Sequence, residues 1–294
     1  MRVNGSVDYA YLHHRLSLSG ETAMNELGAV ATINTLSYQS EGSLRVVALQ
    51  RFYSYRYTTL HGHALNEGGK TQNEQGYYLG ASWQPFVKLQ LKCYADIAYF
   101  PWARYRVSQS SWSQDYVGEV MYLPWKAWTI KARYRLRLRQ MDNTAKTALR
   151  RHNEHRGRLT LGYDAKWWNT TTQFDAVRTA NYAIEQGWML GQKLSMKHAW
   201  WQLSVHGAYF HTDGYDSRLY TYERQLPHEF SFSMFYGRGM RLALIGRAKI
   251  DSALQFDMKI GHTHYYDRQT IGSGLQQINS NRLTDLDLQA RWKF

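Results

Sequence analysis

Residues 284–294, TDLDLQARWKF, separate apolar from polar side chains with a period of two. One face would carry Leu286, Leu288, Ala290, Trp292 and Phe294, and the other Asp285, Asp287, Gln289, Arg291 and Lys293. Successive side chains of a β-strand point to opposite faces of a sheet, whereas a helix would mix the two sets. This stretch therefore predicts an amphipathic β-strand.

The same alternation recurs along the chain, as in LQLKCYADIAY (89–99), WTIKARYRLRLR (128–139) and SALQFDMKI (252–260). Such segments span roughly 10 to 14 residues, nearer to a membrane-crossing strand of about 9 to 11 than to a soluble strand of about 5 to 6. The alternation predicts strands over 6–25, 29–38, 43–54, 74–84, 88–99, 114–123, 128–140, 155–165, 170–181, 185–196, 201–212, 238–250, 253–266 and 284–294. The first segment is long enough for a bend or two strands, and residues 222–236 could add a strand pair within a loop.

Short and long connections alternate between these strands, as outer-membrane barrels require. Short turns are predicted at 39–42, 84–87, 123–127, 166–169, 197–200 and 250–253, and are assigned to the periplasm. Longer connections at 62–73, 101–113, 141–154, 213–237 and 267–283, with shorter joins near Glu26 and Ala183, are assigned to the outside. We predict one domain over 1–294, an all-β, transmembrane, antiparallel up-and-down barrel of about fourteen strands (roughly 12 to 16) with both termini in the periplasm.

Composition agrees with a membrane-embedded sheet better than with a soluble one. Aromatic residues make up 15% of the chain and charged residues 20%. The chain has no apolar run long enough for a transmembrane helix, so a closed sheet is the other way to satisfy backbone groups in lipid. Tryptophans at the predicted turns would form an interfacial girdle: Trp125, Trp128, Trp167, Trp168, Trp200 and Trp201. The alternative is a soluble sandwich whose apolar faces meet each other.

The ends of the chain and its single cysteine carry further expectations. The opening MRVNGSVDYAYL has neither an apolar signal core nor a cleavage site, so we expect a mature form or a fragment of a longer precursor. The lone Cys93 predicts no internal disulfide and no metal cluster, and no cofactor is expected. The net charge of +13 favours anionic partners such as lipopolysaccharide phosphates, nucleic acid or acidic glycans.

A ladder of cations on residues 131–139 is the sharpest local feature. If the apolar face meets lipid, these side chains must face the lumen, because an arginine at the membrane midplane costs about 2 to 4 kcal/mol. The ladder comprises Lys131, Arg133, Arg135, Arg137 and Arg139, and a later strand adds Arg241, Arg247 and Lys249. It would either bind anions in a pore or form a lumenal salt-bridge network with Asp96, Glu119, Asp164, Asp257, Asp285 and Asp287.

Other candidate sites have a plainer interpretation beside the functional one. Asp213 and Asp216 lack the spacing of a calcium loop, so a solvated turn is favoured. His262 and His264 share a strand face without a nearby third ligand. An embedded hydrolase has only fragments of a triad, Ser204 with His206 and Ser252 with His262, and no nucleophile motif. Loop residues would bind an extracellular ligand or lipopolysaccharide: Arg150, Arg151, His152, His155, Arg156, Tyr215, Tyr220, Tyr222, Phe230 and Phe232.

Several stretches resemble the C-terminal barrel of outer-membrane proteins that carry helix-hairpin-helix repeats upstream. They are QNEQGYYLG (72–80), YFPWARYRV (99–107), FHTDGYDSRLYTYE (210–223), FYGRGMR (235–241) and IGSGLQQI (271–278). The family's helical modules resemble those of competence-type DNA receptors, but no such segment is present here, so a nucleic-acid role has no residue in this chain. The last strand, with Leu286, Leu288, Trp292 and Phe294, resembles the signal read by the barrel assembly machinery.

These observations favour a non-enzymatic outer-membrane barrel. It would anchor, or form a narrow or plugged passage for, a periplasmic or secreted partner. An anion-selective pore is the alternative, and a membrane-embedded hydrolase is the weaker one. Expected contacts are outer-membrane lipid and lipopolysaccharide.

Overall fold

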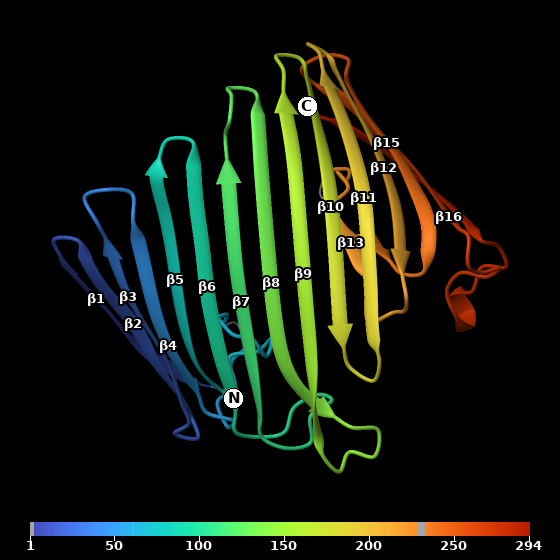
Figure 1. Cartoon of the computed structure of the whole chain (residues 1–294). Coiled ribbons are helices and arrows are strands. Elements are labelled where there is room, and N and C mark those ends of the chain that lie inside the picture. The colour runs from blue at the N-terminus through green and yellow to red at the C-terminus, as the bar shows by residue number, and fades with distance from the viewer. Residues whose placement is uncertain (1–2, 61, 228–232) are drawn as a thin grey trace. The chain divides into compact units, whose positions relative to one another are not determined.

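The computed structural model describes residues 3–60, 62–227 and 233–294, and nearly all of its regular structure is β-strand (Figure 1). The strands are β1 (Asn4–His13), β2 (Leu16–Asn25), β3 (Val30–Gln39), β4 (Arg45–Tyr53), β5 (Glu74–Phe86), β6 (Leu89–Phe100), β7 (Ser111–Tyr122), β8 (Trp128–Asp142), β9 (Leu149–Asp164), β10 (Trp168–Ala180), β11 (Ile184–Lys197), β12 (Trp201–Thr212), β13 (Leu219–Thr221), β14 (Ser233–Phe235), β15 (Arg238–Lys249), β16 (Leu254–Tyr265) and β17 (Arg282–Trp292). A short 3-10 helix, η1 (Gly274–Gln276), lies between β16 and β17. No helix in the described part of the chain has the length and apolar character needed to cross a bilayer.

Fifteen strands follow one another in a single antiparallel up-and-down sheet, from β1 to β12 and then β15 to β17. The predicted first strand, 6–25, is two strands, because His14 adopts a positive φ of 50° and turns the chain back, pairing Asn4 with Asn25. With this odd number of strands, the prediction of both termini on one side of the sheet is not confirmed. The strand pair expected within 222–236 is present as β13 and β14, a separate two-stranded sheet that starts earlier, at Leu219.

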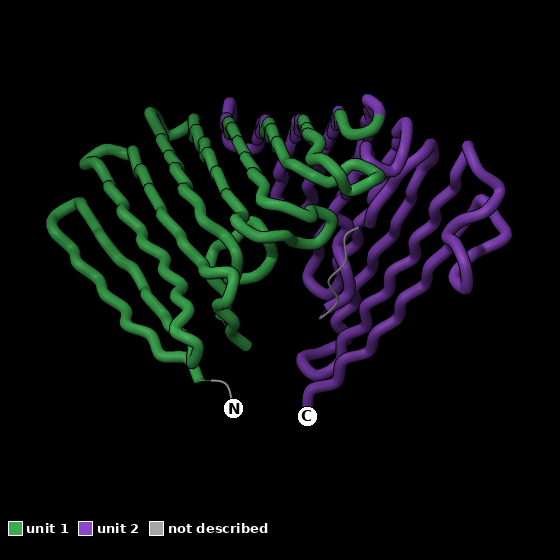
Figure 2. Tube along the Cα trace, turned by 90° about the horizontal axis from the view of Figure 1, so that it is seen from below, with its two compact units in different colours: residues 1–121, 133–155, 180–182 green, residues 122–132, 156–179, 183–294 purple. Residues whose placement is uncertain are grey.

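The chain divides into two compact units, coloured separately in Figure 2. Unit 1 comprises residues 1–121, 133–155 and 180–182, and unit 2 comprises 122–132, 156–179 and 183–294. Unit 1 holds β1 to β7 with most of β8, and unit 2 holds most of β9 and the strands from β10 to β17. The predicted single domain over 1–294 stays a prediction.

Most strands place polar and apolar side chains on opposite faces, as the alternation predicts. On β16, Gln255, Asp257 and Lys259 are buried, whereas Phe256 and Met258 between them are exposed. In each unit we call the side of the sheet that carries the buried charges, Asp257 in unit 2 and Arg51 in unit 1, the polar face, and the opposite side the apolar face. The register carries these faces from strand to strand, with Asp257 opposite Arg247 on β15 and Gln289 on β17.

Burial in this sheet is the reverse of that in a soluble protein. On the polar face Arg51 is 1% exposed and Glu74 is 0% exposed. On the apolar face Leu288 is 69% exposed and Trp292 is 74% exposed. Soluble proteins almost never bury charged side chains fully unless these are paired, as Arg51 and Glu74 are, and their large apolar side chains form the usual interior. The fold therefore hides its charges on one face and presents apolar side chains on the other.

Aromatic rings gather next to the short turn between β9 and β10. The ring of Tyr163 lies 5.0 Å from that of Trp128 and 5.1 Å from that of Trp168. Trp167, in the turn itself, lies 6.4 Å from Trp168. Rings with one apolar body and one polar atom prefer a boundary between an apolar and a wet environment.

Candidate functional site

A buried ion-pair cluster in unit 1 begins at Arg51 on β4. Its Nε donates to Glu74 Oε1 at 2.5 Å and its Nη1 donates to Asp96 Oδ1 at 2.8 Å. Gly76 stands opposite Arg51 in the register, and a Cβ there would lie 2.6 Å from Arg51 Cζ. The missing side chain of Gly76 therefore makes room for the guanidinium to lie across β5 between its two carboxylates.

The same cluster holds the long connection between β4 and β5 against the polar face. Glu74 accepts hydrogen bonds from the backbone N–H of Glu67 and of Gly68, each at 2.9 Å. Tyr53 OH donates to the carbonyl of Leu65 at 2.8 Å. These bonds tie residues 65–68, which belong to a loop, to strands β4 and β5.

Glu67 in this loop reaches the basic ladder of β8. Arg139 Nε donates to Glu67 Oε1 at 3.0 Å, and Arg137 Nη2 lies 3.8 Å from Glu67 Oε2. On β7, Asp115 accepts from Arg135 Nε at 2.8 Å and from Arg137 Nη2 at 3.4 Å. One loop carboxylate and one strand carboxylate thus pair with three arginines of the ladder.

Unit 2 repeats this arrangement with Glu223, which lies in the connection between β12 and β15. Arg241 donates through Nε and Nη2 to the two oxygens of Glu223, each at 3.0 Å, and through Nη1 to Asp285 Oδ1 at 2.6 Å. Lys259 Nζ lies 3.7 Å from Glu223 Oε2 and donates to Gln225 Oε1 at 2.7 Å. Glu223 and Gln225 both belong to the loop. The loop therefore places a carboxylate and a side-chain amide on the polar face.

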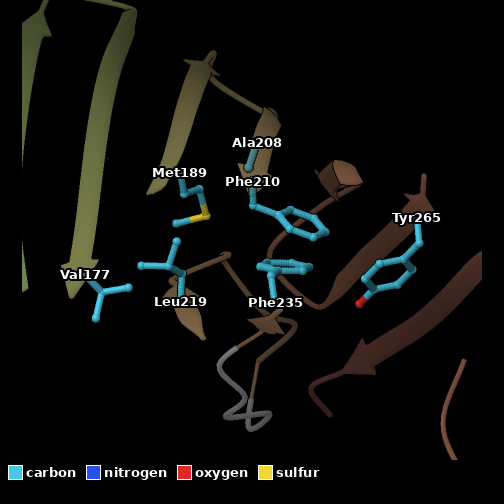
Figure 3. Packing of buried hydrophobic residues seen from close by; sticks show 7 residues of the cluster. All are labelled: Val177, Met189, Ala208, Phe210, Leu219, Phe235 and Tyr265. Atoms are coloured by element: carbon cyan, nitrogen blue, oxygen red, sulfur yellow. The ribbon is translucent and has the colours of Figure 1, made fainter. Parts of the chain in front are cut away.

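Apolar packing fixes the same loop next to β13 and β14. Figure 3 shows the ring of Phe235 on β14 lying against that of Phe210 on β12, with Tyr265 beside them. The centroids of Phe210 and Phe235 are 4.7 Å apart, and Leu219 on β13 belongs to the same buried cluster. Phe210 occupies a polar-face position, so near the long loops this face becomes apolar and binds a loop.

No protein-family model matches this chain, and no curated protein matches it either. Among solved structures, one of porin covers 100% of this chain and 100% of its own length, at 7% identity and a TM-score of 0.48. A deltaS2 mutant of the TodX monoaromatic hydrocarbon channel aligns at 11% identity and a TM-score of 0.35, over 100% of this chain and 88% of its own. At these scores and identities, neither likeness carries a conclusion about the activity of this chain.

Within each unit the predicted cations and acids pair in part with one another and in part with residues outside the prediction. Asp96 pairs with Arg51, Asp257 pairs with Arg247 at 2.6 Å, and Asp285 pairs with Arg241. For Asp164, Asp287 and Lys249 no ion pair is found among the described residues. Glu119 lines a cavity with Arg133, and Lys131 continues the ladder toward the turn. The predicted assembly residues Leu286, Leu288 and Trp292 lie on the apolar face of β17, with Phe294 beyond its end.

Sequence patterns did not identify the acids that hold the ladder. Asp115 had a readable signal, because the alternation of 114–123 places it on the same face as Glu119. Glu67 and Glu223 had none, because both lie in loops, where the period of two no longer assigns a side chain to a face. Their buried contacts are visible only once the loops are folded against the sheet.

The side chains of the other candidate metal sites make ordinary hydrogen bonds. Among the described residues no three His, Cys, Asp or Glu side chains group as metal ligands. His262 Nδ1 contacts Thr284 Oγ1 at 2.8 Å and His264 Nε2 contacts Asn281 at 3.1 Å, so hydrogen bonds occupy both rings. Asp213 accepts the backbone N–H of Gln186 at 2.8 Å, as a turn residue does.

The triad fragments of the hydrolase alternative do not assemble into a triad. Ser204 contacts the hydroxyl of Ser195 at 2.9 Å, whereas His206 contacts the hydroxyl of Thr221, at 3.4 Å. An activated nucleophile needs its base at about 2.6 to 3.2 Å. His206 also lies 3.8 Å from Glu223, a carboxylate already engaged by Arg241.

The prediction that the basic residues 150–156 lie in a loop is wrong, because strand β9 already begins at Leu149 and includes them. The predicted binding residues make several local contacts. Arg150 stacks over the Tyr182 ring at 3.3 Å, and Arg156 lies 5.9 Å from that of Tyr220. Tyr215 packs edge-on against Tyr236. Phe230 and Phe232 lie outside the described residues.

Proposed function

We propose that this chain is a transmembrane β-barrel of a Gram-negative outer membrane, with its apolar face toward lipid and its polar face toward a lumen narrowed by loops. The observation that carries the proposal is the reversed burial of the sheet. Arg51 and Glu74 are buried on the polar face, whereas Leu288 and Trp292 are exposed on the apolar face. In water, exposed apolar surface costs roughly 25 cal/mol per Å², whereas a bilayer covers it.

Strand length and ring placement support the same environment. The strands of the main sheet run from 9 residues in β4 to 16 in β9, enough to cross the apolar layer with tilted strands of about 9 to 11 residues. The rings of Trp128, Tyr163 and Trp168 at a short turn suit the membrane interface. Closure of the sheet, with no free edge in lipid, is part of the proposal, because an open edge would leave backbone groups unpaired.

A narrowed passage is supported by the two loop carboxylates. Glu67 and Glu223 each lie in a loop and tie that loop to arginines on the polar face. If the polar face lines a lumen, a loop folded onto that face would occupy part of the lumen. We therefore favour a plugged or narrow passage over a wide open pore.

Conductance in planar bilayers tests the plug. We expect small or no conductance from the wild type, and a higher one from Glu67→Gln, because the neutral side chain no longer holds Arg137 and Arg139. Glu26→Gln, an exposed turn substitution, is the matched control and should conduct like the wild type. A large wild-type conductance that Glu67→Gln leaves unchanged would instead support the anion-selective pore.

Anchoring of a periplasmic or secreted partner is a separate part of the proposal, and so are the links to the barrel assembly machinery and to nucleic acid. They rest on the resemblance to the helix-hairpin-helix family and on the final strand. Affinity purification from outer membranes tests the anchor, since a stable partner should be recovered with the chain. Recovery of the chain alone, from membranes where it is folded, would contradict it.

A further inference from the structure

Three cations gather at a cavity on the polar face of unit 1. The cavity has a volume of about 270 Å³ and is lined by Arg45, Lys92 and Arg133 together with Tyr78 and Tyr94. We call it the cationic cavity. It is distinct from the ion-pair cluster, because none of its three cations contacts Glu67, Glu74, Asp96 or Asp115.

The register explains why two of the cations, Arg45 and Lys92, converge. Arg45 stands opposite Ser82, and Ser82 stands opposite Lys92, so the two cations share one row of the sheet. Their backbones are two strand spacings apart, about 10 Å, which two long side chains can span. Gly80 lies in the adjacent position of this face and leaves room, and a Cβ there would lie 2.7 Å from Tyr78 OH.

The charges of this cavity are not compensated in the way the neighbouring charges are. On the same face Arg51, Arg135, Arg137 and Arg139 each lie within 4.0 Å of a carboxylate. Within the described part of the chain, no ion pair is found for Arg45, Lys92 or Arg133, and all three are exposed. Glu119 is the carboxylate that lines the cavity with them, so positive charge is in excess there.

We propose that the cationic cavity binds a small solute through a phosphate group. A guanidinium presents paired N–H donors that match two oxygens of one phosphate, and an ammonium adds a point charge. The phenols of Tyr78 and Tyr94, whose rings lie 5.4 Å apart, supply O–H donors and an apolar wall for the rest of the solute. A phosphate carrying about two negative charges would relieve the repulsion among three cations better than a monovalent anion.

This site does not depend on the membrane proposal, since its residues come from one compact unit. Binding can be measured by isothermal titration calorimetry on the full chain folded in detergent micelles. The probes are inorganic phosphate and glycerol 3-phosphate, and glycerol is the uncharged control. Far-UV circular dichroism verifies that each variant is folded.

Both phosphate probes are expected to bind, and Arg45→Gln, Lys92→Gln and Arg133→Gln should each weaken binding about tenfold. Lys126→Gln, which removes an exposed turn charge outside the cavity, should bind like the wild type. Tighter binding of glycerol 3-phosphate than of phosphate would mean that the tyrosine wall contacts the solute, and equal binding that the phosphate group suffices. Absence of heat from both probes at millimolar concentration, equal binding of glycerol, or unchanged affinity in all three cavity variants would overturn the proposal.

Discussion

A glycine lies beneath the arginine of each buried ion-pair cluster. A Cβ at Gly76 would meet the guanidinium of Arg51, and one at Gly261 would meet Arg241 and Asp285. The obstructing atoms are the ends of flexible side chains, so a methyl group displaces them rather than the backbone. Displacement, however, moves a charged group away from carboxylates that are buried with it.

Gly76→Ala should therefore lower the free energy of unfolding by about 2 kcal/mol, because the shifted guanidinium of Arg51 no longer makes well-aligned hydrogen bonds to Glu74 and Asp96. Gly118→Ala on β7 is the matched control, since a Cβ there meets nothing within 4 Å. It should be neutral or slightly stabilising. Urea unfolding of both variants in the same lipid or detergent measures the difference, and equal stability of the two would refute this role for Gly76.

Asp267 and Arg268 form an ion pair in the connection between β16 and β17. Burial raises the pKa of the Asp267 carboxyl, but the hydrogen bond and positive charge of Arg268 outweigh burial and hold that pKa below its usual value. A carboxyl with a depressed folded-state pKa contributes stability above its unfolded pKa of about 3.9 and loses it as the pH falls through the folded-state pKa. The pair is partly exposed, so the contribution should stay below about 1 kcal/mol.

The stability difference between wild type and Asp267→Asn should thus be constant near neutral pH and vanish well below pH 4, about the unfolded carboxyl pKa. Unfolding titrations of both proteins across this range measure it, and subtraction removes the carboxyls they share. High salt should also reduce the difference. A difference that grows as the pH falls would have the wrong sign for this ion pair.

Strand β8 shows how far alternation alone reaches at the scale of an element. The pattern of residues 128–139 predicted both the strand and the common face of its cations. It did not predict their partners, since Asp115 depends on the pairing of β7 with β8, and Glu67 on a loop far away in the sequence. Local periodicity assigns a side chain to a face, whereas partners are assigned by register and loop folding.

The apolar face of β1 to β4 departs from the simple pattern. Asn34 donates to Gln50 at 2.7 Å and accepts from Tyr9 OH, and Thr22 contacts Thr32 at 2.9 Å. These polar groups satisfy one another across neighbouring strands, which lowers the cost of placing them toward an apolar medium. The apolar face can therefore carry amides when they hydrogen-bond to one another in a ladder.

An arginine introduced on the apolar face tests what that face meets. Leu288→Arg, in the middle of β17, should lower the free energy of unfolding in liposomes by about 2 to 4 kcal/mol if lipid covers the position. Leu275→Arg in the connection before β17 replaces a fully exposed leucine of the same unit and should be nearly neutral. Equal effects of the two substitutions would mean that Leu288 faces water.

At the scale of the whole molecule, the sequence predicted an all-β up-and-down sheet with alternating faces, and this is confirmed. Residues 6–25 were counted as one segment, with two strands as the open alternative, because the period of two continues on both sides of the turn at His13 to Leu16 without a glycine or proline to mark it. One missed turn changes an even strand count to an odd one and so affects the predicted side of the N-terminus.

The central claim, that the apolar face contacts lipid, can be tested with the native thiol of the chain. Cys93, the only cysteine in the sequence, is exposed on the apolar face of β6, opposite Ala81 and next along that face to the row of Trp83 and Leu91. In protein folded into liposomes, we predict that a charged, water-soluble maleimide leaves Cys93 unmodified, while a lipid-soluble maleimide labels it. Both reagents should label the urea-unfolded chain. Modification of the folded protein by the charged reagent at the unfolded rate would show that this face is in water, and would contradict the account.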